Sequence, residues 1–139
     1  MTQRFVLDAW ALLALLQSEE PAATRVRQLL EEAQAGNVEL TMSLINLGEV
    51  VYRVGKTHGE ETAWETSSDI RRLPLQIIPV QEDIVWAAVT WKMLHAISYA
   101  DAFAVATAER LDAILLTGDP ELLALTPQIQ IERLTRTPR

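Results

Sequence analysis

The chain has 139 residues, of which 49% are hydrophobic and 22% are charged, so its composition excludes an intrinsically disordered protein and fits one domain spanning residues 1–139. It contains no cysteine, which excludes disulfides and thiolate metal sites and is compatible with the reducing cytoplasm. The net charge of −7 argues against an extended basic surface for nucleic acid, so any nucleic-acid function must rest on local chemistry.

The first part of the chain alternates a β-prone run with helical patterns. Residues 4–7 predict a strand, and the Ala- and Leu-rich run of residues 9–16 favours a helix. Hydrophobic residues at three-to-four spacing after Pro21 predict a second helix, and residues 38–42 predict the next strand. The N-terminal residues do not have the form of a signal peptide, and no apolar run approaches the length of about 20 residues that spans a bilayer. A soluble, cytoplasmic protein is therefore expected.

The middle of the chain predicts a pair of helices and a short strand. From Ser43 hydrophobic residues recur with helical period as far as Gly59, and a polar helix is predicted for residues 60–72. Residues 73–80 include two prolines, which cannot donate to a strand ladder. This third strand is therefore expected near an edge of the sheet.

The last part continues the alternation of helices and strands. Helices are predicted for residues 82–96 and 100–110, a strand for residues 113–116, a helix after Pro120 and a last strand for residues 129–134. Parallel strands need crossover connections, which these helices provide. The predicted fold is a three-layer α/β/α sandwich with a mostly parallel five-stranded sheet, whose ligands bind beyond the carboxyl ends of the strands.

Four acidic residues are expected near that edge of the sheet. Asp8 follows the first strand and Asp119 the fourth, while Glu49 lies in the second turn of the helix after the second strand. Asp101 lies in the first turn of a hydrophobic helix, but its place is less direct because that helix follows another helix.

Each of these acids also has a purely structural explanation. Asp8 is suited to cap the helix that begins at Ala9. Asp119 is suited to cap the next helix after it, because Pro120 then stands at the first helical position. Ser98 and Asp101 have the spacing of a capping box, and Glu49 can pair with Arg53 one turn later. These alternatives stay open at the level of sequence.

A cluster of four carboxylates points to a cation. Carboxylates placed together repel and destabilise the fold unless a cation lies between them. Oxygen ligands without cysteine favour Mg²⁺ or Mn²⁺ over zinc, and carboxylate clusters of this kind serve phosphoryl chemistry.

Four segments in this order resemble the PIN domain, especially the VapC-type toxin ribonucleases of toxin–antitoxin pairs. They are the strand ending at Asp8, residues 43–50 (SLINLGEV), residues 98–102 (SYADA) and residues 116–119 (LTGD). The resemblance spans essentially the full chain. It implies an Mg²⁺- or Mn²⁺-dependent endoribonuclease that hydrolyses RNA phosphodiesters through metal-activated water, a homodimer, and a cognate antitoxin that covers the site.

The resemblance also implies roles for individual residues. The catalytic and metal-binding acids are Asp8, Glu49, Asp101 and Asp119, of which Asp8 and Asp101 are expected to be essential. Asn46 and Thr117 match supporting positions that hold carboxylates or water.

Several points remain open. Many relatives carry a small hydroxyl residue at the position where this chain has Trp10. Trp10 either belongs to the core, narrows the groove or stacks on a base, and the core is the favoured role. Trp64, Trp86 and Trp91 are interpreted as core or interface residues. Arg53, Lys56, Arg71 and Arg72 either line the mouth of the site or form a solvated face.

Two other functions compete with the nuclease. A non-catalytic PIN-like module would use the acidic pocket to bind a basic protein partner, although the presence of all four acids disfavours it. A phosphatase with an aspartyl nucleophile would want a second Asp where Trp10 stands.

Overall fold

The computed structural model describes residues 2–138, which form a fully parallel five-stranded sheet with the strand order β3-β2-β1-β4-β5. The strands are β1 (Gln3–Leu7), β2 (Val38–Ser43), β3 (Gln76–Ile78), β4 (Ile114–Thr117) and β5 (Ile131–Arg133). The predicted fold class is confirmed, and the third strand lies at an edge as expected.

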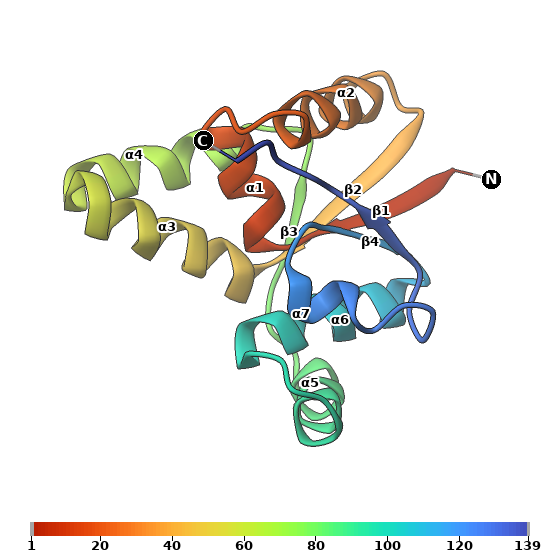
Figure 1. Ribbon diagram of the computed structural model, residues 1–139. Coiled ribbons are helices and arrows are strands. Elements are labelled where there is room, and N and C mark those ends of the chain that lie inside the picture. Colours follow the sequence, from red (N-terminus) through yellow and green to blue (C-terminus); the bar gives the residue numbers. More distant parts are fainter. Residues whose placement is uncertain (1, 139) are drawn as a thin grey trace.

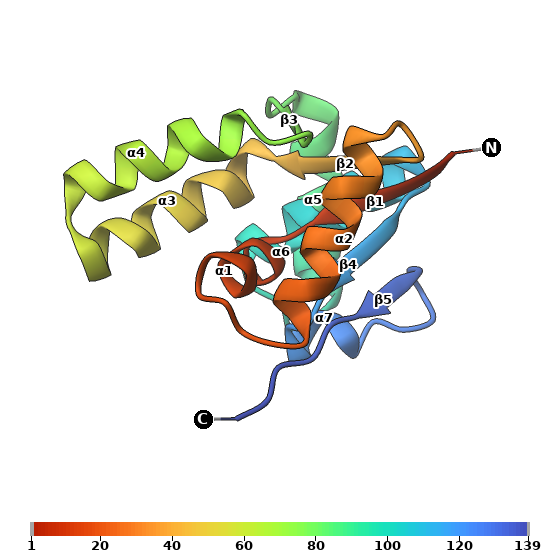
Figure 2. The same ribbon diagram turned by 90° about the horizontal axis from the view of Figure 1, so that it is seen from above.

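Helices cover both faces of this sheet (Figure 1). They are α1 (Ala9–Leu16), α2 (Ala22–Gln34), α3 (Leu44–His58), α4 (Glu60–Arg71), α5 (Glu82–Leu94), α6 (Tyr99–Leu111) and α7 (Pro120–Leu123). Helices α1 and α2 lie on one face, and α5, α6 and α7 lie on the other. Helices α3 and α4 form a hairpin that extends away from the sheet (Figure 2).

The sheet separates two hydrophobic clusters. In the central strand β1, Phe5 and Leu7 face the cluster under α1 and α2, and Val6 faces the cluster under α6. Successive side chains of a strand point to opposite faces, so a strand covered on both sides is continuously hydrophobic. Residues 102–108 of α6 are all buried, which makes this helix the centre of its layer.

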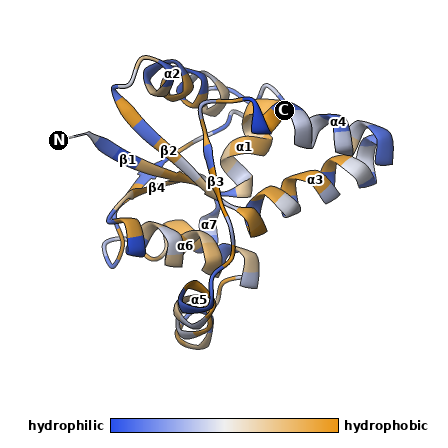
Figure 3. Cartoon of the chain, turned by 180° about the vertical axis from the view of Figure 1, so that it is seen from behind, coloured by the Kyte–Doolittle hydropathy of each residue, from blue (hydrophilic) through white to orange (hydrophobic). Residues whose placement is uncertain are grey.

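The turn between α3 and α4 depends on glycine. Gly59 has a φ of 95°, which a residue without a Cβ adopts at little cost. A Cβ at Gly55 would lie 3.2 Å from the Cβ of Ala63, so the two helices pack closely at this point. The far end of the hairpin is hydrophilic (Figure 3).

Some predictions from the sequence need correction. Strand β3 covers only residues 76–78 rather than 73–80, because a proline lies on each side of it. Trp64 and Trp86 are 61% and 60% exposed, so a core position is wrong for both, and their alternative role as interface residues stays a prediction. Trp91 packs in part against the cluster under α6. No helix among residues 2–138 is both long and apolar enough to cross a membrane.

Candidate metal centre

Two of the four acids reach the carboxyl edge of the sheet on neighbouring strands. Asp8 directly follows β1, and Asp119 stands two residues after β4. These strands pair in parallel with Leu7 beside Leu116. The pairing therefore places Asp8 next to Thr117.

Asp8 lies at the buried base of the site. Its Oδ1 accepts a hydrogen bond of 2.9 Å from the backbone N–H of Ala11, and its Oδ2 accepts one from the hydroxyl of Thr117. The Thr117 hydroxyl oxygen in turn accepts the backbone N–H of Asp119 at 3.0 Å. Burial raises the pKa of Asp8 from 3.8 to about 7, and these two hydrogen bonds offset the rise only in part.

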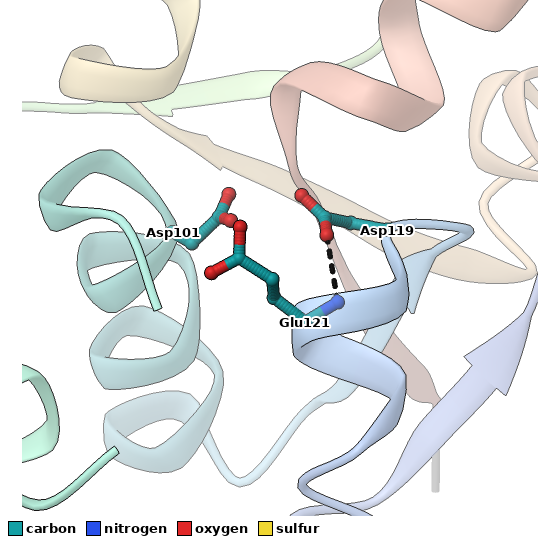
Figure 4. A group of neighbouring side chains, drawn as sticks. All are labelled: Asp101, Asp119 and Glu121. Atoms are coloured by element: carbon teal, nitrogen blue, oxygen red, sulfur yellow. Dashed lines mark hydrogen bonds between the residues drawn. The ribbon is translucent and has the colours of Figure 1, made fainter. Parts of the chain in front are cut away.

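Asp101 enters the site from the first turn of α6. The Ser98 hydroxyl caps this helix by accepting the backbone N–H of Asp101 at 3.1 Å. The Asp101 carboxyl is buried and lies beside those of Asp119 and Glu121 (Figure 4). Burial raises its pKa to about 8, and the negative charge of Asp119 adds to the rise.

Glu121 belongs to the same cluster. One carboxylate oxygen each from Asp101, Asp119 and Glu121 lie within 4.8 Å of one another, an arrangement that could hold a metal ion. The sequence interpretation missed Glu121. The available signal was its place in the first turn of α7, where Asp119 caps the helix and Pro120 fixes its start.

Helix α3 supplies Glu49 and Asn46. The Asn46 amide donates to the carbonyl of Ala100 at 3.0 Å and so ties α3 to the start of α6. Glu49 Oε2 pairs with Arg53 at 3.0 Å. The other side-chain oxygens, Asn46 Oδ1 and Glu49 Oε1, are buried and have no hydrogen-bond partner among the described residues.

These observations show that the residues fit a divalent cation. Burial raises the pKa of the Asp8 and Asp101 carboxyls, and two further buried oxygens, Asn46 Oδ1 and Glu49 Oε1, have no hydrogen-bond partner among the described residues. A divalent cation would stabilise the charged form of these carboxyls, and it prefers oxygen ligands.

The structural explanations of three of the acids are also confirmed, and they are compatible with a cation. For Asp101 the structure shows only the Ser98 half of the predicted capping box, in which the Ser98 hydroxyl accepts the N–H of Asp101. Asp8 and Asp119 cap α1 and α7, and Glu49 pairs with Arg53. The cap of Asp119 uses Oδ1, and the ion pair of Glu49 uses Oε2. In these two residues a second oxygen is left for a ligand, and the caps fix the direction of the carboxylates.

A groove of about 700 Å³ opens beside the cluster. It runs between α1 on one side and the α3–α4 hairpin on the other, and its lining includes Trp10, Arg53 and Lys56. Arg71 and Arg72 do not line it, so only two of the four basic residues considered from the sequence are at the mouth. Trp10 is half-buried and packs partly against the core.

Comparison with known proteins agrees with this architecture. Residues 5–126 match the sequence model of the PIN domain. No curated protein matches the chain. The fold is similar to that of the VapBC2 complex of Rickettsia felis bound to a promoter DNA fragment, with a TM-score of 0.73, 18% identity, and coverage of 96% of this chain and 100% of that chain.

Two further solved structures have a similar fold. VapBC-1 of nontypeable Haemophilus influenzae gives a TM-score of 0.70 at 21% identity, covering 94% of this chain and 98% of that chain. VapC20 of Mycobacterium tuberculosis, a sarcin–ricin loop cleaving toxin, gives 0.69 at 18% identity, covering 88% of this chain and 95% of that chain. With the family match over most of its length and an acidic cluster at the carboxyl edge of a parallel sheet, the chain belongs to the PIN-domain family.

Proposed function

We propose that this chain is a divalent-metal-dependent endoribonuclease and the toxin of a VapBC-type toxin–antitoxin pair. The observation that carries the proposal is the acidic cluster, which combines buried carboxyls of raised pKa with unpartnered buried oxygens. The helix cap occupies one oxygen of Asp119 and the ion pair with Arg53 occupies one oxygen of Glu49, so each carboxylate keeps a second oxygen for a ligand.

The four acids Asp8, Glu49, Asp101 and Asp119 are the proposed ligands of Mg²⁺ or Mn²⁺, joined by Glu121. A divalent cation at such a site lowers the pKa of water and neutralises the charge that develops on a phosphodiester during hydrolysis.

Thr117 and Asn46 have positioning roles in this proposal. Thr117 connects the carboxylate of Asp8 to the backbone of Asp119, so one hydroxyl fixes two acids from neighbouring strands. Asn46 joins α3 to the residue before Asp101 through the carbonyl of Ala100. Both contacts hold carboxylates that come from separate elements in one arrangement.

An antitoxin is the proposed protein partner, because the similar structures include VapBC complexes from several bacteria. A tail of this partner is expected to cover the groove and the acids. The homodimer and the cytoplasmic location expected from the sequence stay predictions.

Cleavage of total RNA by the purified, antitoxin-free protein tests the enzyme. Discrete cuts are expected with Mg²⁺ or Mn²⁺, none with EDTA, and none from folded Asp8→Asn or Asp101→Asn variants. Asp69→Asn is the matched control, because Asp69 is an exposed acid on α4 outside the groove. Intact RNA with either metal would reject the enzyme and favour the binding module. Normal cleavage by both site variants would reject the catalytic assignment of the acids.

A further inference from the structure

We propose that Arg136 binds a phosphate of the RNA strand in the groove beside the acidic cluster, and that Trp10 and Glu19 hold its guanidinium there. This inference rests on the proposed ribonuclease function and adds a substrate contact outside the acidic cluster.

The segment after β5 brings Arg136 to the groove. Arg136 forms an antiparallel bridge with Pro21 in the connection between α1 and α2. Two backbone hydrogen bonds hold the segment there, from Ala22 N–H to the Thr135 carbonyl at 2.9 Å and from Thr137 N–H to the Glu20 carbonyl at 2.8 Å. Arg136 is thereby fixed as part of the groove lining.

Two side chains fix the guanidinium of Arg136. Its Nη1 donates to both carboxylate oxygens of Glu19, at 3.1 and 3.2 Å. Its central carbon lies 5.3 Å from the ring centroid of Trp10, within the range of a cation–π contact. The Arg136 side chain is still 51% exposed. A guanidinium has five N–H donors, so the pairing through Nη1 leaves others for a phosphate.

Trp10 connects this arginine to the acidic cluster. It lies in α1 two residues after Asp8, and its ring covers Gly118, the residue before Asp119. A Cβ at Gly118 would lie 2.3 Å from the Trp10 ring, so the ring fills the space of a side chain at position 118. The ring therefore forms the wall of the groove between the acids and Arg136.

The groove carries cations as well as the acidic cluster. Arg53 and Lys56 line it from α3, and Arg136 lines it from the side of α1. Its carboxylates are Glu19, Glu49, Asp101 and Asp119, and two of them pair with Arg136 and Arg53. In this proposal the RNA strand that is cut at the acids continues along this groove, where basic side chains on both walls contact its phosphates. Arginine suits the contact, because its planar fork matches the geometry of a phosphate.

Binding of a single-stranded RNA oligonucleotide tests the inference. Fluorescence anisotropy is measured in EDTA with the Asp101→Asn background, so that the RNA stays intact, over a range of NaCl concentrations. Arg136→Gln is expected to weaken binding about tenfold, as for loss of a charge-assisted hydrogen bond, and to reduce the slope of log K against log[salt] by about 0.7. Arg133→Gln, an equal change of charge at the end of β5 outside the groove, is expected to leave both unchanged.

Conservative variants separate the roles of the two side chains. Arg136→Lys is expected to keep the salt slope and to lose part of the affinity, because it retains the charge without the planar fork. Trp10→Leu is expected to weaken RNA binding, because it removes the aromatic ring that holds the guanidinium of Arg136. Trp10→Phe keeps an aromatic ring and is expected to bind RNA more tightly than Trp10→Leu. In the unmodified background, Arg136→Gln is expected to raise KM more than it lowers kcat.

The outcomes distinguish this inference from the proposed enzyme. If the protein cleaves RNA but Arg136→Gln behaves like Arg133→Gln in affinity and slope, the phosphate contact is wrong and the enzyme stands. If the protein does not cleave RNA but its binding depends on Arg136 as described, the contact stands and the enzyme fails. Equal dependence on Arg136 for polyglutamate, used as an acidic peptide probe, would overturn the contact in favour of a protein ligand.

Discussion

Replacing Asp8 by asparagine should stabilise the metal-free protein at alkaline pH while abolishing its activity. The side-chain oxygen of the new amide can still accept the N–H of Ala11, and its nitrogen can donate to the Thr117 hydroxyl, so the packing is retained. The substitution removes the buried negative charge and also the acceptor of the Thr117 hydroxyl proton. The lost acceptor acts at every pH, so the pH dependence of the effect on stability reports the cost of ionising this carboxyl without a cation.

The magnitude follows from the pKa of Asp8. Because burial raises this pKa from 3.8 to about 7, the folded state binds a proton more tightly than the unfolded state. The resulting stability is fully present below pH 3.8 and is lost as the pH rises through about 7. At about 1.4 kcal/mol for each tenfold change in proton affinity, the loss is roughly 4 kcal/mol. Asp101, whose pKa is also raised, contributes in the same direction.

Urea unfolding in EDTA at pH 4 and pH 8 measures this effect. At pH 8 the free energy of unfolding of Asp8→Asn should exceed that of the wild type by up to roughly 4 kcal/mol, and the two should agree more closely at pH 4. Adding Mg²⁺ at pH 8 should stabilise the wild type and not the variant. Asp69→Asn, which changes an exposed acid, controls for the loss of one charge. Equal stability of Asp8→Asn and the wild type at both pH values would refute the reasoning.

Three further substitutions test neighbouring contacts. Thr117→Val keeps the shape of the side chain but leaves the carboxylate of Asp8 without its hydroxyl donor. Activity should be lost, and the free energy of unfolding should fall by about 1–3 kcal/mol. Thr117→Ser keeps the hydroxyl and should retain both activity and stability. Glu121→Gln should weaken Mn²⁺ binding about tenfold in a calorimetric titration, and an unchanged affinity would remove Glu121 from the ligands. Gly118→Ala should cost about 1–3 kcal/mol in urea unfolding, because its Cβ would overlap the Trp10 ring, and the double variant with Trp10→Leu should recover most of that loss.

The parts of the fold that were predictable from sequence follow from burial on both faces of the sheet. Residues 5–7 and 113–116 form continuous hydrophobic runs because β1 and β4 lie between two layers of helices. Parallel crossovers then bring strand ends and helix starts to one edge. This is why Asp8 and Asp119 could be placed there from their positions in the sequence alone.

Other features were not visible in the sequence because they depend on contacts across the fold. Glu121 has the pattern of an ordinary acidic residue in a first helical turn, and only the position of α6 brings Asp101 within reach of it. Helical spacing could not show that Trp64 in α4 is exposed. The contact between Trp10 and Arg136 joins residues from opposite ends of the chain, which no local pattern reveals.

The packing of α6 in the hydrophobic core determines where Asp101 lies in the acidic site. Asp101 lies in the first turn of a helix in which residues 102–108 are all buried, and four of these seven are alanines. Larger side chains at Ala104 or Ala106 would displace the whole helix, because a close-packed interior does not absorb an extra methylene locally. Variation at such remote positions would thus change metal affinity before it unfolds the protein, and a screen for altered metal dependence should find core alanines as well as carboxylates.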